Sequence, residues 1–462
     1  MSILSRAKRT GDPFLFYMWI VGGLIAVSIL CIAIEYIWGS GYILKNLTSV
    51  LTLSMDEDDS WGPMLEAAYA RYNRVEGGIY QFIFFEEGIK FQYPPISILP
   101  YFLALKVGFG YDTLFELSCA LSLFSMFCMA YCGYVISVII LEKYSEDGSL
   151  LINRKIALFF VSVLGVFTFY PIWIGQYIGQ IQVILDFLIT FAFMAWLFNW
   201  KHLSGGAIAV VALFKPQIAV ILLWALFRKQ KKLVIGMMIV FVPAGIVSLV
   251  VFGFQEHVEY LKVISHMGRR GEVIWANQSV GGILHRLFTD ADPLVFHAKS
   301  FAPFNMFVYV TTLVSSALLL LFGLLFYKPI GEASLKSWDR LVYSALDLAT
   351  MMFLLTIATP IAWGHHYGIL WPGISIAILV AIHFLVEKRS WSGVTLVVLC
   401  GSYFLISNHF IFLHTKQFSG VPINLIQSYN FLGGILLLIG LLFLRNFYLK
   451  ASKVEEVGVR SH

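Results

Sequence analysis

The sequence predicts an all-α protein that crosses a membrane about a dozen times. Of its 462 residues, 59% are hydrophobic and only 13% are charged, and the mean hydropathy is +0.80. A single soluble core cannot bury so large an apolar fraction, so lipid must solvate most of the surface. Apolar runs of about 20 residues, the length that a helix needs to span a bilayer, recur along the whole chain.

The first apolar run, 14–37, predicts a retained helix that begins on the cytoplasmic side. Arg6, Lys8 and Arg9 precede it, and no small-residue cleavage site follows it. The stretch 95–109 is short and begins at a double proline, so we expect a helix in the outer interface. Further spans are expected at 113–141, 155–172, 180–199, 232–253, 303–327, 342–358, 367–386, 391–411 and 424–444.

The stretch 204–228 decides the topology. One straight span would place the basic cluster 228–232, and every basic loop after it, on the outside, against the positive-inside rule. Two half-helices that reverse at Lys215-Pro216-Gln217 keep these loops inside, because proline breaks a helix and broken backbone is tolerated where it lines a protein cavity.

Counting this pair as two predicts twelve segments in one domain, 1–462, with both termini in the cytoplasm. The opposite side then receives two large loops, 38–112, which carries interfacial helices, and 254–302. The net charge of +5 comes from short basic clusters between apolar runs, which indicates cytoplasmic loops and excludes nucleic-acid binding. The five cysteines lie in apolar stretches without metal-ligand spacing, so neither disulfides nor zinc are expected.

Four acidic residues, Asp56-Glu57-Asp58-Asp59, follow the first helix and should lie at the outer surface. Acid clusters in loops are usually solvated and inert. One carboxylate here can instead act as a general base that takes the proton of an attacking hydroxyl group. The surrounding loop favours this function, because it continues as an amphipathic stretch and ends in an aromatic, proline-rich segment that contains Tyr93.

Amide side chains gather at a predicted turn between two helices. Gln176, Gln180 and Gln182 lie with Gly175 and Gly179 where one helix ends outside and the next begins. Such residues often only satisfy backbone groups, but amides at a helix N-terminus can also bind sugar hydroxyls or phosphate.

Lys215 is expected deep in the membrane and facing a cavity. Burying an ionisable residue at this depth costs roughly 2.5–3.5 kcal/mol or more, so Lys215 is a functional candidate with an anion as its natural partner. A structural ion pair with Asp186 or Asp347, both inside apolar runs, is the alternative.

Two further polar segments complete the outer set: Asn277-Gln278-Ser279 with Arg286, and Trp363 with His365 and His366. Arginine and histidine beside one anion fit a phosphate group, which a guanidinium binds through two hydrogen bonds. Adjacent histidines point apart on a helix and no third ligand stands in register, so a metal site is not expected.

In this order, the motifs resemble the GT-C glycosyltransferases of family 87, polyprenyl-phosphate-dependent mannosyl- and arabinosyltransferases of bacterial membranes. They are an external acid after the first helix, a Tyr-Pro-Pro, a Gly-Gln-x-Gln turn, a Lys-Pro in a broken helix, an Asn-Gln-Ser and a Pro-x-x-Trp-x-His-His. The resemblance runs from residue 14 to about 440, and the ordered set is more specific than any single motif. It implies a GT-C fold whose outer loops cover a cavity open to lipid and to the periplasm.

The resemblance also implies inverting transfer of a sugar, mannose rather than arabinose, from a polyprenyl-phosphate donor to a lipid or cell-envelope glycan acceptor. It implies a bacterial plasma membrane, a site facing the periplasm, and no cofactor, nucleotide sugar or essential metal. Asp59 fits the base of the family best, by its distance to Ala67-Ala68. Asp58 and Asp56 stay open as the base because this chain has four acids, and Gln182 stands where the family often has Asn.

The chemistry agrees with these roles, because an inverting displacement needs a base on one side of the sugar and cations at the leaving phosphate. We therefore expect Asp59, or Asp58, as the base and Lys215 with the histidine pair at the phosphate. The remaining expected substrate contacts are Tyr93, Gln180, Gln182, Asn277, Gln278, Arg286 and Trp363. A secondary transporter or flippase for a lipid-linked or anionic substrate is the alternative, but its polar residues should line a path that reaches both faces.

Overall fold

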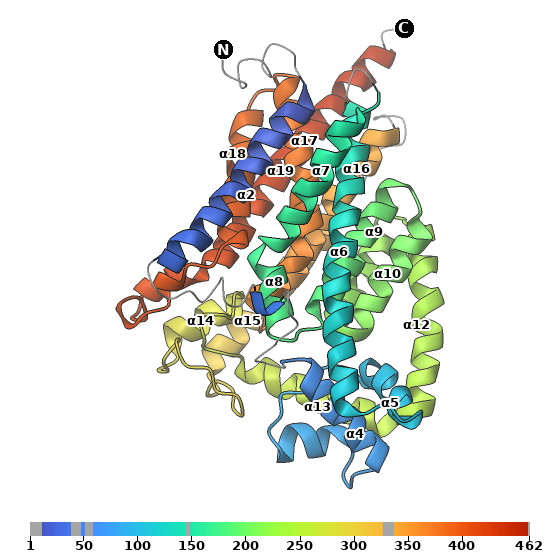
Figure 1. Cartoon of the computed structure of the whole chain (residues 1–462), viewed down its shortest axis with the longest axis vertical. Coiled ribbons are helices and arrows are strands. Elements are labelled where there is room, and N and C mark those ends of the chain that lie inside the picture. The colour runs from blue at the N-terminus through green and yellow to red at the C-terminus, as the bar shows by residue number, and fades with distance from the viewer. Residues whose placement is uncertain (1–11, 38–47, 51–58, 145–147, 327–336, 461–462) are drawn as a thin grey trace.

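The protein is entirely helical in the part of the chain that its structure, a computed structural model, describes (Figure 1). That part comprises residues 12–37, 48–50, 59–144, 148–326 and 337–460. Within it, the only β-type pairing is one antiparallel bridge between Asn277 and Trp363. The prediction of an all-α fold is confirmed.

Seven helical stretches of the described chain are long and apolar enough to span a membrane. They are Pro13–Ile37 (α2), Tyr111–Tyr144 (α6), Lys231–Phe252 (α12), Met306–Leu325 (α15), Ser337–Ile357 (α16), Gly364–Val386 (η4, Gly364–Leu370, with α17, Trp371–Val386) and Ile423–Lys450 (η7, Ile423–Ser428, with most of α19, Tyr429–Arg460). An eighth forms if Ile152–Phe167 (α7) and Tyr170–Tyr177 (α8), bent by 57° against each other, count as one. The chain is thus a polytopic membrane protein, and the count of twelve crossings stays a prediction.

The predicted break at Lys215 is present. Lys201–Phe214 (α10) ends there, and a 3-10 turn, Pro216–Ala219 (η3), leads into Val220–Phe227 (α11). Lys201 is the first residue of α10, and Gln230 follows the end of α11. The Lys201 ammonium group donates a hydrogen bond of 2.6 Å to Gln230 Oε1. The start of α10 and the end of α11 therefore lie side by side, which confirms that the chain reverses between them.

Close backbone contact holds α10 against α12. Gly205 of α10 and Gly236 of α12 each lie against the backbone of the other helix, and a Cβ on Gly236 would collide with the carbonyl group of His202. Small residues at a crossing let two helices in lipid approach closely. The half-helix pair is thereby fixed to a membrane-spanning neighbour.

The interior of the bundle contains α16 and η4–α17, most of whose residues are buried, whereas α2 and α12 are largely exposed on the outside. The helix α9 (Gln182–Leu197) packs against α6, α10 and α17. Polar residues on α9 and η4 can therefore face protein rather than lipid, as polar groups at membrane depth must.

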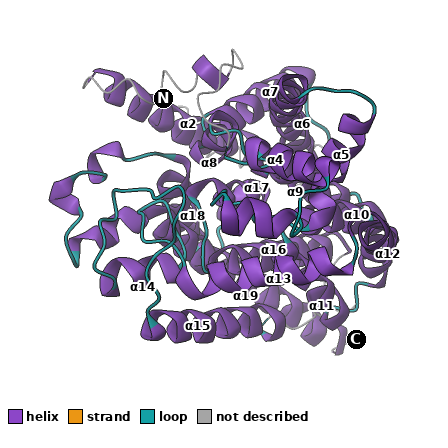
Figure 2. Cartoon of the chain, turned by 90° about the horizontal axis from the view of Figure 1, so that it is seen from below, coloured by secondary structure: helices purple, strands orange, loops and turns teal. Residues whose placement is uncertain are grey.

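Short helices gather at one end of the bundle, which we call the loop end (Figures 1 and 2). They are α4 (Trp61–Asn73), η1 (Gln81–Glu86), η2 (Pro95–Ile98), α5 (Leu99–Lys106), α13 (Phe254–Arg270) and α14 (Val280–Phe288). The chain between α18 (Ser392–Ser407) and η7 adds two 3-10 turns, η5 (Ile411–Leu413) and η6 (Lys416–Phe418). The helix α2 begins, and α19 ends, at the opposite end of the molecule.

Candidate active site

The backbone that carries Asp59 is fixed to the turn between α8 and α9. The Asp59 amide donates a hydrogen bond of 2.9 Å to the Ile178 carbonyl, and the Ser60 amide donates one of 3.1 Å to the Gly179 carbonyl. Gly179 has a φ of 66°, a left-handed conformation that glycine adopts without strain. The start of α4 is therefore held against the α8–α9 turn.

Gln180 joins three side chains in one hydrogen-bond network. Its amide nitrogen donates to Asp59 Oδ2, and its Oε1 accepts a hydrogen bond of 2.6 Å from the Ser60 hydroxyl. The Tyr93 hydroxyl lies 2.6 Å from Ser60 Oγ and 3.3 Å from Gln180 Oε1. Burial raises the pKa of Tyr93, so its hydroxyl stays protonated. Three residues expected at the site from the sequence, Asp59, Tyr93 and Gln180, are thus brought together.

Lys215 lies within electrostatic range of this network. Its buried ammonium interacts with Asp59 and with Asp186 of α9. Its field also reaches His365 and His366 of η4. A carboxylate of the α4 loop, a lysine at the helix break and the histidine pair therefore belong to one constellation.

Asp186 connects α9 to η4. Gln182 Nε2 donates a hydrogen bond of 2.5 Å to Asp186 Oδ1. The other carboxylate oxygen of Asp186 lies against Gly368, where a Cβ would collide with it. On the neighbouring helix α8, Gly175 lies against His365. We call the residues that meet here the Asp59–Lys215 cluster: Asp59, Tyr93, Gln180, Gln182, Asp186, Lys215, His365 and His366.

Three buried polar atoms of the cluster have no hydrogen-bond partner among the described residues: Gln182 Oε1, Asp186 Oδ2 and His365 Nε2. Buried polar groups are nearly always hydrogen-bonded, so such atoms in one cluster indicate a place for a polar ligand or for water. The set combines acceptors with an imidazole nitrogen that can donate or accept, which suits a ligand with several hydroxyl groups.

Asp347, the second carboxylate considered as a partner for Lys215, belongs to another pair. Its Oδ2 accepts a hydrogen bond of 2.6 Å from Arg228 Nε at the end of α11. The side chains of both residues are buried. Asp186, and not Asp347, is therefore the carboxylate that lies near Lys215.

The Asn277-Gln278-Ser279 segment binds other loops of the protein. Asn277 Oδ1 accepts hydrogen bonds from the Ala362 amide at 3.0 Å and from the Ser279 hydroxyl at 2.9 Å. Ser279 Oγ also caps the start of α14. Gln278 Nε2 donates to the carbonyls of Trp275 and Gln427, and the Tyr367 hydroxyl donates to the Gln278 carbonyl.

Arg286 is also buried and bound to protein. Its Nη1 donates to the Asn277 carbonyl at 2.9 Å, and its Nη2 donates to the Ser428 hydroxyl at 2.6 Å. Burial lowers the pKa of Arg286 to about 10, so the guanidinium remains charged at neutral pH. Trp363 is half-buried, pairs with Asn277 through the β-bridge and packs edge-on against Phe296. These residues adjoin η4 but are not in the Asp59–Lys215 cluster.

Asp58 and Asp56, the alternative bases, lie outside the described residues. Within the described ranges, no group of three or more His, Cys, Asp and Glu side chains could hold a metal ion. Independence from a metal stays a prediction.

Two residues near this site were not expected there from the sequence. Asp186 was considered only as an ion-pair partner, although an ionisable residue within a membrane segment is a functional candidate by default. Asn430 was not considered; its buried Oδ1 has no hydrogen-bond partner among the described residues, and its amide group lies near Gly364 at the start of η4.

Comparison with known families decides the class of protein. The sequence matches glycosyltransferase family 87 over residues 91–354, more than half of the chain. The chain belongs to this family. Neither a curated protein nor a solved structure matches it. The matched range contains Tyr93, Gln180, Gln182, Lys215 and Asp186, which is most of the Asp59–Lys215 cluster. The protein is a membrane glycosyltransferase, as the ordered motifs predicted.

Proposed function

We propose that this family 87 glycosyltransferase transfers mannose from a polyprenyl-phosphate donor to a lipid or cell-envelope glycan acceptor, with inversion at the anomeric carbon. The reaction takes place at the loop end, facing the periplasm of a bacterial plasma membrane. The observation that carries the proposal is that the buried ammonium of Lys215 lies within electrostatic range of Asp186 and of the exposed carboxylate of Asp59. A base and a cation on two sides of one space match the charges that develop in this reaction.

Asp59 is the general base in this scheme. Its carboxylate takes the proton of the acceptor hydroxyl while the acceptor oxygen forms a bond to the anomeric carbon. The bond from that carbon to the phosphate oxygen breaks, and the polyprenyl phosphate leaves with the electron pair. Gln180 positions the base, since its amide group donates a hydrogen bond to one carboxylate oxygen of Asp59.

Lys215 stabilises the departing phosphate. A donor group that meets the charge of a transition state typically contributes about 10²–10³-fold in rate. Asp186 positions the lysine, and the unpaired atoms of Gln182 and His365 bind hydroxyl groups of the sugar. His366 lies in the field of Lys215 and completes the phosphate side. The lipid-linked sugar is the only donor, and neither a nucleotide sugar nor a metal enters the scheme.

Asn277, Gln278, Arg286 and Trp363 support this site from the side. Their hydrogen bonds join the segment before α14 to the turn before η4, as in the bond from Ala362 to Asn277. We propose that they hold η4, and hence the histidine pair, in position, because the amide groups of Asn277 and Gln278 and both Nη atoms of Arg286 are already bound to protein. Tyr93 acts likewise on the α4 side, through Ser60.

Asp59→Asn tests the proposal. The variant keeps an oxygen for Gln180 but removes the base, so sugar transfer from a polyprenyl-phosphate donor should fall about 10²–10⁴-fold. Glu66→Gln, on the exposed face of α4, is the matched control and should leave transfer unchanged. Normal transfer by Asp59→Asn, together with loss in Asp58→Asn or in Asp56→Asn, would move the base to that residue; normal transfer by all three variants would reject an aspartate base.

A further inference from the structure

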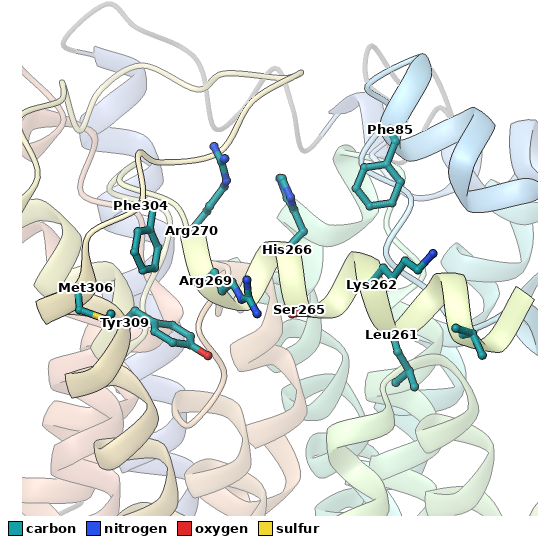
Figure 3. A pocket seen from close by; sticks show the side chains of 11 residues that line it. Phe85, Leu261, Lys262, Ser265, His266, Arg269, Arg270, Phe304, Met306 and Tyr309 are labelled. Atoms are coloured by element: carbon teal, nitrogen blue, oxygen red, sulfur yellow. The ribbon is translucent and has the colours of Figure 1, made fainter.

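A second feature of the loop end is a large basic cavity along α13. It has a volume of about 880 Å³ and lies between α13, η1 and the start of α15 (Figure 3). Four basic side chains of α13 line it: Lys262, His266, Arg269 and Arg270. No acidic side chain is among the residues that line it. A cavity of this size is within the range that holds a small-molecule ligand.

The two arginines are the cations that remain open to a ligand. Both are exposed, and no ion pair joins either of them to a carboxylate within the described part of the chain. Lys262 is partly neutralised by Glu259, whose Oε1 lies 2.8 Å from its Nζ. His266 packs edge-on against Phe85, and both burial and Arg270 lower the pKa of this imidazole. The cavity therefore presents two uncompensated guanidinium groups, which bind phosphate in a bidentate manner.

Apolar side chains border the same cavity. Leu261 is 64% exposed, Phe304 is 51% exposed and Met306 is 63% exposed. Figure 3 shows Arg270 and His266 pointing away from the membrane-spanning helices and Leu261 pointing toward them. Because α13 follows α12 directly and the cavity reaches the start of α15, it lies where two spans leave the membrane. A helix with cations on one face and apolar residues on the other is typical of the membrane interface.

We propose that this cavity binds the phosphate headgroup of an anionic lipid from the leaflet at the loop end, with acyl chains along Leu261 and Met306. Arg269 and Arg270 bind the phosphate, and Lys262 adds a weaker contact. A free phosphate ion satisfies the arginines but leaves the apolar border in water, which favours a lipid as the occupant. The α13 cations are not members of the Asp59–Lys215 cluster, so this site does not depend on the proposed transfer reaction.

The test measures lipid binding to the full-length purified protein in detergent. Phosphatidylglycerol is titrated, and bound lipid is counted by native mass spectrometry. The variant Arg269→Gln/Arg270→Gln should bind about 5-fold more weakly for each arginine and about 30-fold more weakly for both, given the usual attraction between a basic residue and an anionic lipid. Lys388→Gln/Arg389→Gln removes two exposed cations from the turn between α17 and α18 and should bind as the parent does.

Each alternative outcome is decisive. If the arginine variant binds the lipid as tightly as the parent, the proposed site is wrong. If both double variants lose lipid binding equally, the attraction is a general effect of charge and the cavity is not a specific site. Phosphatidylcholine binding as tightly as phosphatidylglycerol overturns the anionic headgroup. If inorganic phosphate displaces phosphatidylglycerol at equal concentration, and Met306→Ser binds phosphatidylglycerol as the parent does, the ligand is not a lipid. Because both arginines are exposed, unchanged thermal unfolding of the variant excludes misfolding as the cause of weaker binding.

Discussion

The pair of Arg228 and Asp347 gives the sharpest prediction about stability. It joins α11, the second half of the broken helix, to the buried helix α16. Asp347 accepts hydrogen bonds from Arg228 Nε at 2.6 Å and from Trp224 Nε1 at 3.2 Å. Arg228 also donates to the carbonyls of Leu324 at 2.7 Å and Gly323 at 3.2 Å at the end of α15. One guanidinium thus links three helices.

The single variant Asp347→Leu should be severely destabilised. It removes the carboxylate that neutralises the buried cation and leaves Arg228 with the carbonyl acceptors of Leu324 and Gly323. Breaking a buried pair in this way typically costs about 3–5 kcal/mol. Arg228→Met should cost less, because a carboxyl group can take up a proton, whereas a guanidinium cannot lose one.

The double variant Arg228→Met/Asp347→Leu should recover most of the loss. Replacing a whole buried pair by apolar residues of similar size is often neutral or stabilising by about 1–4 kcal/mol. The assay is the free energy of unfolding of all four proteins in bicelles, from titration with a denaturing detergent, analysed as a double-mutant cycle. The reasoning is refuted if Asp347→Leu is as stable as the parent, or if the double variant is no more stable than Asp347→Leu.

Three further predictions concern the site and its supports. Gln180→Leu removes the hydrogen bond to the Asp59 carboxylate, which contributes about 1.5–3 kcal/mol, so kcat/KM for transfer should fall about 10–150-fold. In the Asp59→Asn background, Gln180→Leu should cause no further loss of transfer. Gly368→Ala places a Cβ in a buried carboxyl group and should abolish transfer in membranes, whereas Gly364→Ala, which meets only ordinary contacts, should retain it. Burial lowers the pKa of His285 to about 4, so its neutral form stabilises the fold above its unfolded pKa and this stability is lost as the pH falls toward 4. His285 should contribute about 2 kcal/mol to the drop in the free energy of unfolding between pH 7 and pH 5, and His285→Gln should remove this part of the pH dependence.

The broken helix was predictable because two independent rules agreed on it. Pro216 interrupts the helical hydrogen bonds, and the basic loops from 228–232 onward stay on the cytoplasmic side only if the stretch 204–228 reverses instead of crossing once. The hydrogen bond from Lys201 to Gln230 then confirms the reversal. Asp59, Gln180 and Lys215 could likewise be named, because polar residues are rare in so apolar a chain and each one has few alternative roles.

The roles of Asn277, Gln278 and Arg286 could not be predicted from the sequence. A polar residue in an external loop can face a substrate or another loop, and only distant contacts decide between these. The partner of Arg286 Nη2 is Ser428, 142 residues further along the chain. The basic cavity on α13 escaped notice for the same reason, since its border includes Phe304, from a segment that joins α13 only in the fold.

The Asp59–Lys215 cluster lies where helices break, and proline accounts for the breaks. Pro171 opens α8, Pro216 follows Lys215, and Pro360 precedes η4. A broken helix at membrane depth leaves backbone groups unpaired and is tolerated only where protein surrounds it. The buried helices α16 and α17 supply that surrounding, so the polar side chains of Lys215 and His365 lie inside the bundle instead of in lipid. The same prolines that would weaken a simple membrane helix therefore bring Lys215 and the histidine pair together inside the bundle, within electrostatic range of Asp59.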